Sequence, residues 1–202
     1  MATITQLKVQ ARNKQRVNVY LDNNFFCGLQ AETVLKHNLK TGDEIEKQKL
    51  ELVQFESEKQ VAFSKVLNLI SKREKTSHQV NTYLKDKGYT QKTIDYVVNK
   101  LKEYGYINDE KFAQNFMNAQ ANTKGIRKIK QQLMLKGIDD KIIKQILANM
   151  PEQSSQIENL TNKYMNNKEN NQKNRSKLYA YLLRRGFTYD QIEPYINNYK
   201  DE

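Results

Sequence analysis

Two pairs of adjacent carboxylates come closest to a catalytic pattern in this sequence. Asp109 and Glu110 form one pair, Asp139 and Asp140 form the other, and such pairs could suggest a nuclease. Each pair stands at the predicted start of a helix, where the helix dipole favours anions and where adjacent side chains project in different directions. We therefore predict that these residues serve to cap helices.

Residues for nucleophilic or metal chemistry are scarce. Cys27 is the single cysteine and follows two phenylalanines, which favours a buried small hydrophobe over a reactive thiol. His37 and His78 lie far apart in the sequence, and both are expected to be solvated. The chain has no glycine-rich phosphate loop, GxSxG motif or HExxH motif. These observations predict a protein that is not an enzyme and that has no cofactor or metal site.

Basic residues are the more informative group. The 202 residues include 34 Lys and Arg against 23 Asp and Glu, a net charge of +11. Residues 1–59 carry 9 basic and 8 acidic residues, whereas residues 60–202 carry 25 and 15. This asymmetry favours a polyanion-binding module beside a near-neutral one. The alternative is that lysine-rich helices only keep the protein soluble or reflect an AT-rich genome.

The cations that we predict to bind a partner lie in or beside the middle helix of three predicted helical units. Repeating cations along an elongated edge could follow a phosphate backbone or an acidic protein groove. Phosphate contacts of this kind give affinity that is independent of sequence and sensitive to salt. The candidates are Lys72, Arg73, Lys124, Arg127, Lys128, Lys130, Lys136, Arg175, Lys177, Arg184 and Arg185.

Composition excludes several other classes. No stretch approaches the roughly 18 consecutive apolar residues of a membrane span, and the N-terminus lacks the pattern of a secretory signal. Mean hydropathy is −0.88 and only 38% of residues are hydrophobic. We expect a cytoplasmic, mostly helical protein, a monomer, that does not bind membranes and whose helices stay partly wet.

The N-terminal segment, residues 1–59, is predicted to be a small α+β domain with a β-hairpin. The predicted elements are strands at 7–10, 17–21 and 25–29, a hairpin turn at 22–24, a short helix at 31–37 and a second helix from Ile45 to Phe55. Residues 50–55 could instead form a strand. We find no chemistry in this segment.

An internal repeat of 49 residues organises the rest of the chain. Gly88, Gly137 and Gly186 are spaced by this interval without a gap. The same offset relates five further columns: Leu84, Leu133 and Leu182; Val80, Ile129 and Leu178; Ile94, Ile143 and Ile192; Tyr89, Ile138 and Phe187; and Lys87, Lys136 and Arg185. So many agreeing columns predict three related units, at 60–105, 106–151 and 152–202.

Each unit is predicted to contain three helices. Thr90, Asn108 and Asp139 are expected to cap helices, and the repeated glycine is expected to end the middle helix. One unit of this size cannot bury enough apolar surface alone, so stacked units should share cores and form an elongated, curved body. The fold class is therefore mainly α: three tandem three-helix repeats preceded by the small α+β segment.

Within the second unit, Ile126, Ile129 and Leu133 are predicted to form the buried stripe of the middle helix. That stripe leaves the neighbouring cations largely on the solvent side. The aromatic residues that we expect to pack rather than to stack on bases are Tyr83, Tyr89, Tyr104, Tyr106 and Phe187.

The third unit departs from the pattern. Its polar stretch at 166–174 is expected to be a frayed helix end and a mobile loop. Pro194 falls inside the last helix, where it removes a backbone hydrogen bond and should kink or restart the helix.

Several ordered motifs resemble the RecX family of recombinase regulators. They are residues 105–113 (GYINDEKFA), the pairs Lys124-Gly125 and Lys136-Gly137, residues 71–77 (SKREKTS) and residues 84–89 (LKDKGY). The resemblance covers residues 60–190, and the N-terminal segment resembles an extension found in some members. One departure is Asn108, where the family usually has an aspartate; asparagine caps a helix equally well.

The resemblance implies a modulator that binds the groove of a RecA filament on DNA and suppresses its ATPase, coprotease and strand-exchange activities. It also implies a role in DNA repair and the SOS response. Binding to single- or double-stranded DNA without a recombinase is an alternative, because three-helix units can resemble helix-turn-helix modules. A third hypothesis is a scaffold for an acidic protein.

Overall fold

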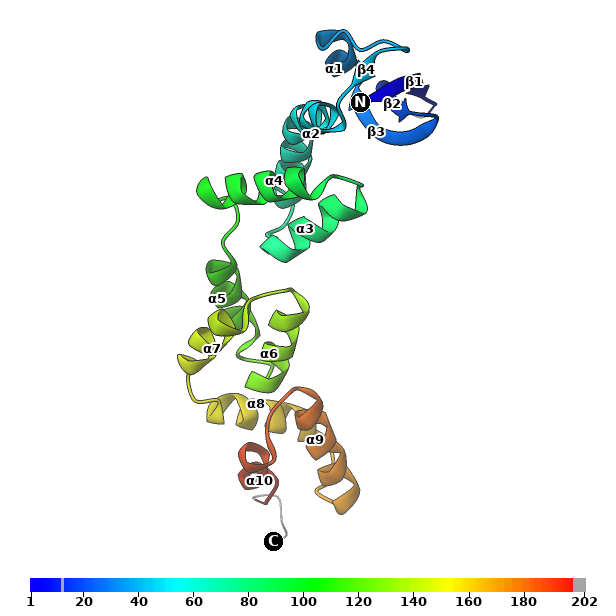
Figure 1. Cartoon of the computed structure of the whole chain (residues 1–202). Helices are drawn as coiled ribbons and strands as arrows, with labels where there is room; N and C mark the ends of the chain where they lie inside the picture. The colour runs from blue at the N-terminus through cyan, green and yellow to red at the C-terminus, as the bar shows by residue number, and fades with distance from the viewer. Residues whose placement is uncertain (12, 198–202) are drawn as a thin grey trace. The chain divides into compact units, whose positions relative to one another are not determined.

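The computed structural model describes residues 1–11 and 13–197, in which an antiparallel sheet is followed by a series of helices (Figure 1). The chain divides into two compact units. The first unit comprises Met1–Glu74 and Val80–Ile107, and the second comprises Lys75–Gln79 together with the chain from Asn108 onward. The end of the predicted third repeat, residues 198–202, lies outside the described residues.

The sheet has the strand order β3-β2-β1-β4, with antiparallel neighbours. Its strands are β1 (Ala2–Gln10), β2 (Asn13–Leu21), β3 (Asn24–Gln30) and β4 (Glu44–Ile45), and helix α1 (Ala31–Lys36) follows β3. The three predicted strands, the hairpin turn and the short helix are confirmed. Asp22 and Asn23 form the turn with φ angles of 48° and 68°, as a tight hairpin between twisted strands requires. Ile45 pairs with Ala2 as part of β4 and does not begin a helix.

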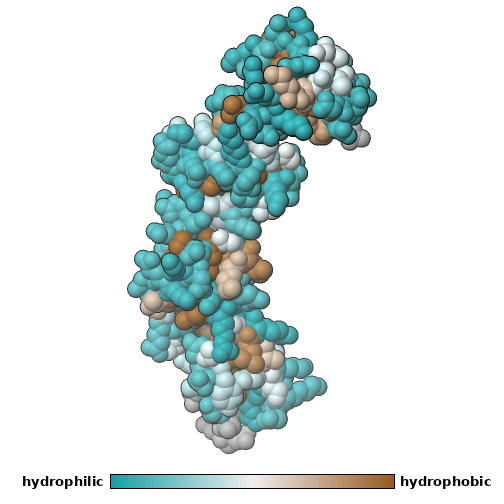
Figure 2. Space-filling view, in the orientation of Figure 1, coloured by the Kyte–Doolittle hydropathy of each residue, from teal (hydrophilic) through white to brown (hydrophobic). Residues whose placement is uncertain are grey.

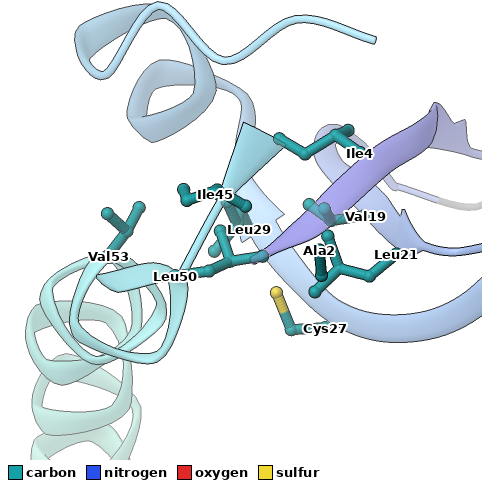
Figure 3. Close-up of a cluster of buried hydrophobic side chains, with 9 residues drawn as sticks. All are labelled: Ala2, Ile4, Val19, Leu21, Cys27, Leu29, Ile45, Leu50 and Val53. Carbon is teal, nitrogen blue, oxygen red and sulfur yellow. The ribbon is translucent and has the colours of Figure 1, made fainter. Parts of the chain in front are cut away.

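One face of the sheet buries an apolar core (Figure 3). The core residues are Ala2, Ile4, Val19, Leu21, Cys27, Leu29, Ile45, Leu50 and Val53. Cys27 is 2% exposed, which confirms its predicted burial. Desolvation raises the pKa of its thiol to about 12, and the charge of Glu58 acts in the same direction. The thiol is therefore an apolar packing group at neutral pH.

Helix α2 (Lys47–Ile70) is 24 residues long and joins the sheet to the first repeat. Its first turns contribute Leu50 and Val53 to the core of the sheet, and its last turns contribute Ala62 and Val66 to the next core. The expected helix is confirmed over residues 47–55, and the alternative strand at 50–55 is not formed. The helix does not end before the first repeat as expected, since the segment has no glycine or proline to interrupt it.

Two buried polar residues fix α2 between these cores. The Ser57 hydroxyl accepts a hydrogen bond from the backbone N–H of Gln30 in β3 (2.9 Å). Glu58 is 3% exposed and accepts hydrogen bonds from the Thr93 hydroxyl (3.2 Å) and the Gln54 amide (2.9 Å). Because a buried carboxylate without partners would be strongly destabilising, these donors define the position of α2 against its neighbours.

Eight further helices make up the remaining repeats. They are α3 (Ser77–Asp86), α4 (Gln91–Glu103), α5 (Asp109–Gln120), α6 (Ile126–Leu135), α7 (Asp140–Ala148), α8 (Ser154–Met165), α9 (Gln172–Arg184) and α10 (Tyr189–Asn197). With the end of α2, they complete three tandem three-helix repeats, as predicted. Each repeat has a separate apolar core, which explains the modest hydrophobic content of the chain.

The predicted helix caps are present. The side chains of Thr90, Asn108 and Asp139 accept hydrogen bonds from backbone N–H groups in the first turns of α4, α5 and α7. Each satisfies one of the donors that a helix start leaves without an intrahelical partner. Asn108 performs this role with an Asn108 Oδ1 to Lys111 N distance of 2.8 Å.

The third repeat differs from two expectations. Only residues 166–171 of the polar stretch connect helices, because Asn171 caps α9 by accepting a hydrogen bond from the N–H of Asn174 (2.9 Å). Helix α10 continues through Pro194 and does not restart there.

Candidate nucleic-acid and protein-binding surface

The second unit contains a close contact between the start of α6 and the end of α9. The N–H of Gly125 donates a hydrogen bond to the carbonyl oxygen of Arg185 (2.9 Å). A Cβ at Gly125 would overlap the backbone of Gly186, and a Cβ at Gly186 would lie 2.5 Å from the backbone nitrogen of Lys128. Gly186 also has a φ of +93°, so both the approach and the backbone conformation require glycine there.

The same contact occurs 49 residues earlier in the second unit. The Thr76 hydroxyl donates a hydrogen bond to the carbonyl oxygen of Lys136 (2.6 Å), and a Cβ at Gly137 would overlap the side chain of His78. Thr76 precedes Gly125 by 49 residues, as Lys136 precedes Arg185. The sequence repeat therefore corresponds to a repeated contact, which we call the repeat joint: residues 76–78 with 136–137, and residues 125–128 with 185–186.

The cations of α6 differ in their surroundings. Arg127 is exposed and has no ion pair among the described residues. Lys128 is half-buried and donates a hydrogen bond to the side chain of Gln131 (3.0 Å). Lys130 lies 3.8 Å from a carboxylate oxygen of Asp140. The helix contains three cations and no acidic residue, so its outer surface is positive.

Helix α9 is the counterpart of α6 and is also free of acidic residues. Lys177 and Arg184 are exposed. Arg175 is half-buried and donates hydrogen bonds to the side chains of Asn170 (3.2 Å) and Gln172 (3.4 Å). The repeat joint thus brings the start of one acid-free basic helix against the end of another.

Besides Lys128, Lys130 and Arg175, three more of the predicted binding cations make internal contacts. Arg185 donates a hydrogen bond to the carbonyl oxygen of Thr123 (2.8 Å) and covers the ring of Tyr181 (4.6 Å to its centroid). The Lys136 ammonium lies over the rings of Phe112 and Phe116 at 5.7 and 5.3 Å.

The third, Lys124, donates a hydrogen bond to Gln132 (2.8 Å). The contacts of Arg185, Lys136 and Lys124 all lie within the second unit and stabilise it. A periodic sequence pattern alone does not distinguish such cations from exposed ones.

Lys72 and Arg73 belong to a different unit from the other candidates. Both are exposed in the connection after α2 and belong to the first unit, whereas the other nine belong to the second.

The acidic pairs take structural positions. A carboxylate oxygen of Asp109 accepts a hydrogen bond from the N–H of Ser77 (2.8 Å), and Asp139 caps α7. Asp140 lies 2.7 Å from the Lys144 ammonium, and this hydrogen bond lowers the pKa of the Asp140 carboxyl. Within the described residues, no group of three or more His, Cys, Asp or Glu could hold a metal ion.

The predicted packing of the aromatic residues is confirmed. Tyr89 and Phe187 are buried, and Tyr104 packs edge to face against Phe63 and Tyr106, although Tyr104 and Tyr106 are 55% and 56% exposed beyond the end of α4. One predicted position of an apolar side chain is wrong. Ile126 is 37% exposed, because it is the first residue of α6 and the buried stripe begins at Ile129. Figure 2 shows hydrophobic residues in separate patches on a mostly hydrophilic face.

Sequence reasoning missed one buried amide. Gln153 is 3% exposed and its side-chain N–H groups donate to the carbonyl oxygens of Ala121 and Lys124, both at 2.9 Å. It connects the start of α8 to the loop before α6. A glutamine between Pro151 and a helix carries no signal that distinguishes it from a solvated residue.

Among the described helices, none combines the length and the apolar composition needed to cross a bilayer.

Comparison with known sequence families matches four consecutive stretches. Residues 2–46 match the N-terminal domain of the regulatory protein RecX, and residues 62–101, 108–147 and 152–196 match its first, second and third three-helix domains. A relative from Clostridium tetani, named regulatory protein RecX, is 32% identical over 200 residues that cover 96% of this chain and 93% of the relative.

Solved structures have the same fold. A crystal structure of a regulatory protein RecX aligns with a TM-score of 0.63 at 22% identity, over 98% of this chain and all of the other. RecX from Lactobacillus salivarius aligns with a TM-score of 0.62 at 28% identity, over 69% of this chain and 95% of the other.

Proposed function

Because this chain belongs to the RecX family of regulatory proteins, we propose that it binds a filament of the RecA recombinase on DNA and suppresses the ATPase, coprotease and strand-exchange activities of RecA. In this proposal it acts as a monomer in the cytoplasm, without catalysis of its own. It contributes there to the control of DNA repair and the SOS response.

The observation that carries the proposal is the joint between two basic helices. Helices α6 and α9 together contain seven cations and no acidic residue, and the hydrogen bond from Gly125 to Arg185 fixes the start of one against the end of the other. A positive surface of this kind is complementary to regularly spaced negative charges, whether phosphates or acidic side chains.

Within this surface we assign the partner contacts to the most exposed cations. Arg127, Lys177 and Arg184 can reach a partner without the loss of an internal contact. Lys128, Lys130 and Arg175 would contribute after local rearrangement, since each already has a polar neighbour. We also retain Lys72 and Arg73 of the first unit as contacts, together with Lys124, Lys136 and Arg185.

DNA-dependent ATP hydrolysis by RecA tests the proposal. The rate should fall several-fold as the protein is titrated to stoichiometry with RecA. An unchanged rate at stoichiometric excess would contradict the proposal.

A charge-reversed variant tests the surface. Arg127→Glu combined with Lys177→Glu should weaken inhibition about tenfold, because each reversal replaces an attractive contact with a repulsive one. The matched control is Lys47→Glu with Lys49→Glu, which changes the net charge equally at two exposed positions of α2. Equal weakening by both variants would show that total charge matters and that the α6–α9 surface does not.

Direct DNA binding without a recombinase is the second candidate, and the acid-free helices favour it equally. A mobility-shift series against salt separates the two. Tight binding at physiological salt in the absence of RecA would favour the second candidate, whereas binding that requires RecA would favour the first.

A further inference from the structure

The third repeat carries two aromatic rings at positions where the other repeats carry polar pairs. Tyr179 on α9 and Tyr189 on α10 meet edge to face, with ring centroids 5.8 Å apart. The residues 49 positions earlier are Lys130 and Asp140, which form an ion pair. The second repeat therefore forms the same three helices with charged residues at these two positions. It follows that the three-helix fold of the third repeat does not require the aromatic pair.

A cavity of about 300 Å³ opens beside these rings. Its lining combines two aromatic rings, one aliphatic side chain and polar groups of α9: Tyr179, Tyr189, Ile196, Gln172, Arg175 and Ser176. Tyr189 is 54% exposed, so its ring is accessible to a ligand. A second cavity of about 240 Å³, between α5 and α7, is lined by no aromatic residue. The cavity of the third repeat therefore offers a flat apolar surface, and its volume is at the lower end for small-ligand sites.

The charges around the cavity are of opposite sign on its two helices. Arg175 of α9 lines the cavity, Lys173 and Lys177 follow the lining residues Gln172 and Ser176 in the sequence, and α9 has no acidic residue. On α10, Asp190 and Glu193 lie near Tyr189, and the charge of Glu193 is the main cause that raises the pKa of the Tyr189 hydroxyl. An anionic group is therefore favoured on the α9 side only, and the part of the ligand beside α10 must be uncharged.

An unpaired nucleotide meets these requirements. Its base is flat, uncharged and able to stack on an aromatic ring, and its phosphates can lie along the cationic helix. Bases of a duplex are stacked and paired and cannot enter the cavity. An acidic peptide would supply the negative charge beside α9 but not the flat, uncharged group that stacks on the aromatic ring.

We propose that the cavity between α9 and α10 binds an unpaired base of single-stranded DNA, with the base on Tyr189 and the adjacent phosphates near Lys173 and Lys177. This inference rests on the proposed function, because it gives the third repeat a contact with the single strand of a filament. The first and second repeats have no equivalent aromatic pair at these positions, so the contact is specific to the third.

The absence of tryptophan from the chain provides a direct test. In a Tyr189→Trp variant, oligo(dT) should quench the single tryptophan by at least half, because a stacked base quenches indole emission. An oligonucleotide of the same length with abasic sites should quench little. The matched control is Tyr104→Trp, at a position that is 55% exposed and beside Lys100, where oligo(dT) should have little effect.

A second variant transplants the polar pair of the second repeat. Tyr179→Lys with Tyr189→Asp leaves the net charge unchanged and reproduces a pair that this fold already accommodates. Its affinity for oligo(dT) should fall about tenfold. Tyr179→Phe with Tyr189→Phe retains both rings and should retain the affinity.

Four outcomes would overturn the subsite: equal quenching by abasic oligonucleotide, equal quenching by duplex, full affinity of the Lys/Asp variant, or no binding of oligo(dT) at low salt. If circular dichroism shows that the Lys/Asp variant is unfolded, the Tyr189→Trp result decides alone. RecA ATPase assays with the unmodified chain separate the two proposals. Inhibition without base-dependent quenching overturns only the subsite, whereas base-dependent quenching without inhibition supports the subsite and contradicts the proposed function.

Discussion

The two units of this protein connect their parts in different ways. In the first, α2 runs without interruption from the core of the sheet into the core of the first repeat, and Ser57 and Glu58 fix it through buried hydrogen bonds. In the second, separate helices meet through the repeat joint, where glycine permits close backbone approach. The first connection depends on a continuous helix and a buried carboxylate, and the second depends on the absence of side chains.

This difference predicts different sensitivities to mutation. A shared helix couples two cores through many apolar contacts. The stability of this connection is therefore distributed over many residues, and most single substitutions in it should have a small effect. At the repeat joint a single added methyl group meets backbone atoms that cannot move independently, so few positions carry much of the effect.

The rate at which Cys27 is alkylated should measure how readily the first unit opens, and it should show the largest change. At pH 8, burial that raises its pKa from 9.0 to about 12 leaves about a thousandfold less thiolate than in the unfolded chain, so iodoacetamide should react at least that much more slowly. Mass spectrometry during a urea titration measures the rate. Rapid labelling in native buffer would show that the first unit opens readily.

The same thiol predicts a pH dependence. Its pKa is higher in the folded chain, so its contribution to the free energy of unfolding is complete below about 9 and is lost as the pH rises towards about 12. Cys27→Ala should remove this part of the dependence, as measured by urea unfolding at several pH values. An unchanged pH profile would argue that the thiol is not desolvated.

Gly186→Ala tests the second connection. The added Cβ would lie 2.5 Å from backbone and side-chain atoms of Lys128 at a φ of +93°, and we expect the free energy of unfolding to fall by about 3 kcal/mol. Gly88→Ala is the matched control, since Gly88 also follows a middle helix with positive φ but its Cβ would have no neighbour within 4 Å. It should cost only about 1 kcal/mol. Equal losses in the free energy of unfolding would mean that the positive φ angle, and not the close approach of Lys128, is the reason that glycine is required at position 186.

Glu58→Ala should destabilise the first unit by about 2 kcal/mol, because Thr93 and Gln54 lose the carboxylate that accepts from them. Thermal unfolding of this variant, of Thr93→Val and of the double variant measures the coupling between the two side chains. Additive losses would show that the buried hydrogen bond does not connect α2 to α4.

Substitution of the adjacent residues Arg184 and Arg185 should have the smallest effect on stability. It also distinguishes a cation that stabilises the fold from one that is available to a partner. Arg185→Ala should lower stability by about 1 kcal/mol, since it removes the bond to the Thr123 carbonyl and the contact with Tyr181. Arg184→Ala, at an exposed position, should leave stability unchanged and weaken inhibition of RecA instead. Urea unfolding and the ATPase assay together check this division, which identical effects would refute.

Local signals in the sequence predicted most of the fold. The hairpin turn at Asp22 and Asn23 and the caps at Thr90, Asn108 and Asp139 act within a few residues of their position, so a single sequence reveals them. The 49-residue spacing identifies the glycines after the middle helices, but it does not show that Gly137 and Gly186 approach His78 and Lys128. The continuity of α2 was missed because apolar periodicity cannot show that Leu50 and Val66 belong to different cores.

The candidate site was predictable only in part. The sequence locates the cations on the middle helices, but their contacts depend on residues far away: Thr123 for Arg185 and the two α5 phenylalanines for Lys136. The pairing of Tyr179 with Tyr189 depends likewise on how α9 and α10 pack. Spacing identifies which residues are equivalent, and tertiary structure determines which of them are available to a partner.

The repeat joint also bears on how such a chain can diverge. Its acceptor is in each case a main-chain carbonyl, and its donor is either a main-chain N–H, at Gly125, or a hydroxyl, at Thr76. Substitutions over most of each repeat therefore leave the connection intact, provided that the glycine after the middle helix is kept. A chain connected in this way can drift far from its relatives in sequence, retain the same succession of repeats, and vary the outer faces of its helices independently from one repeat to the next.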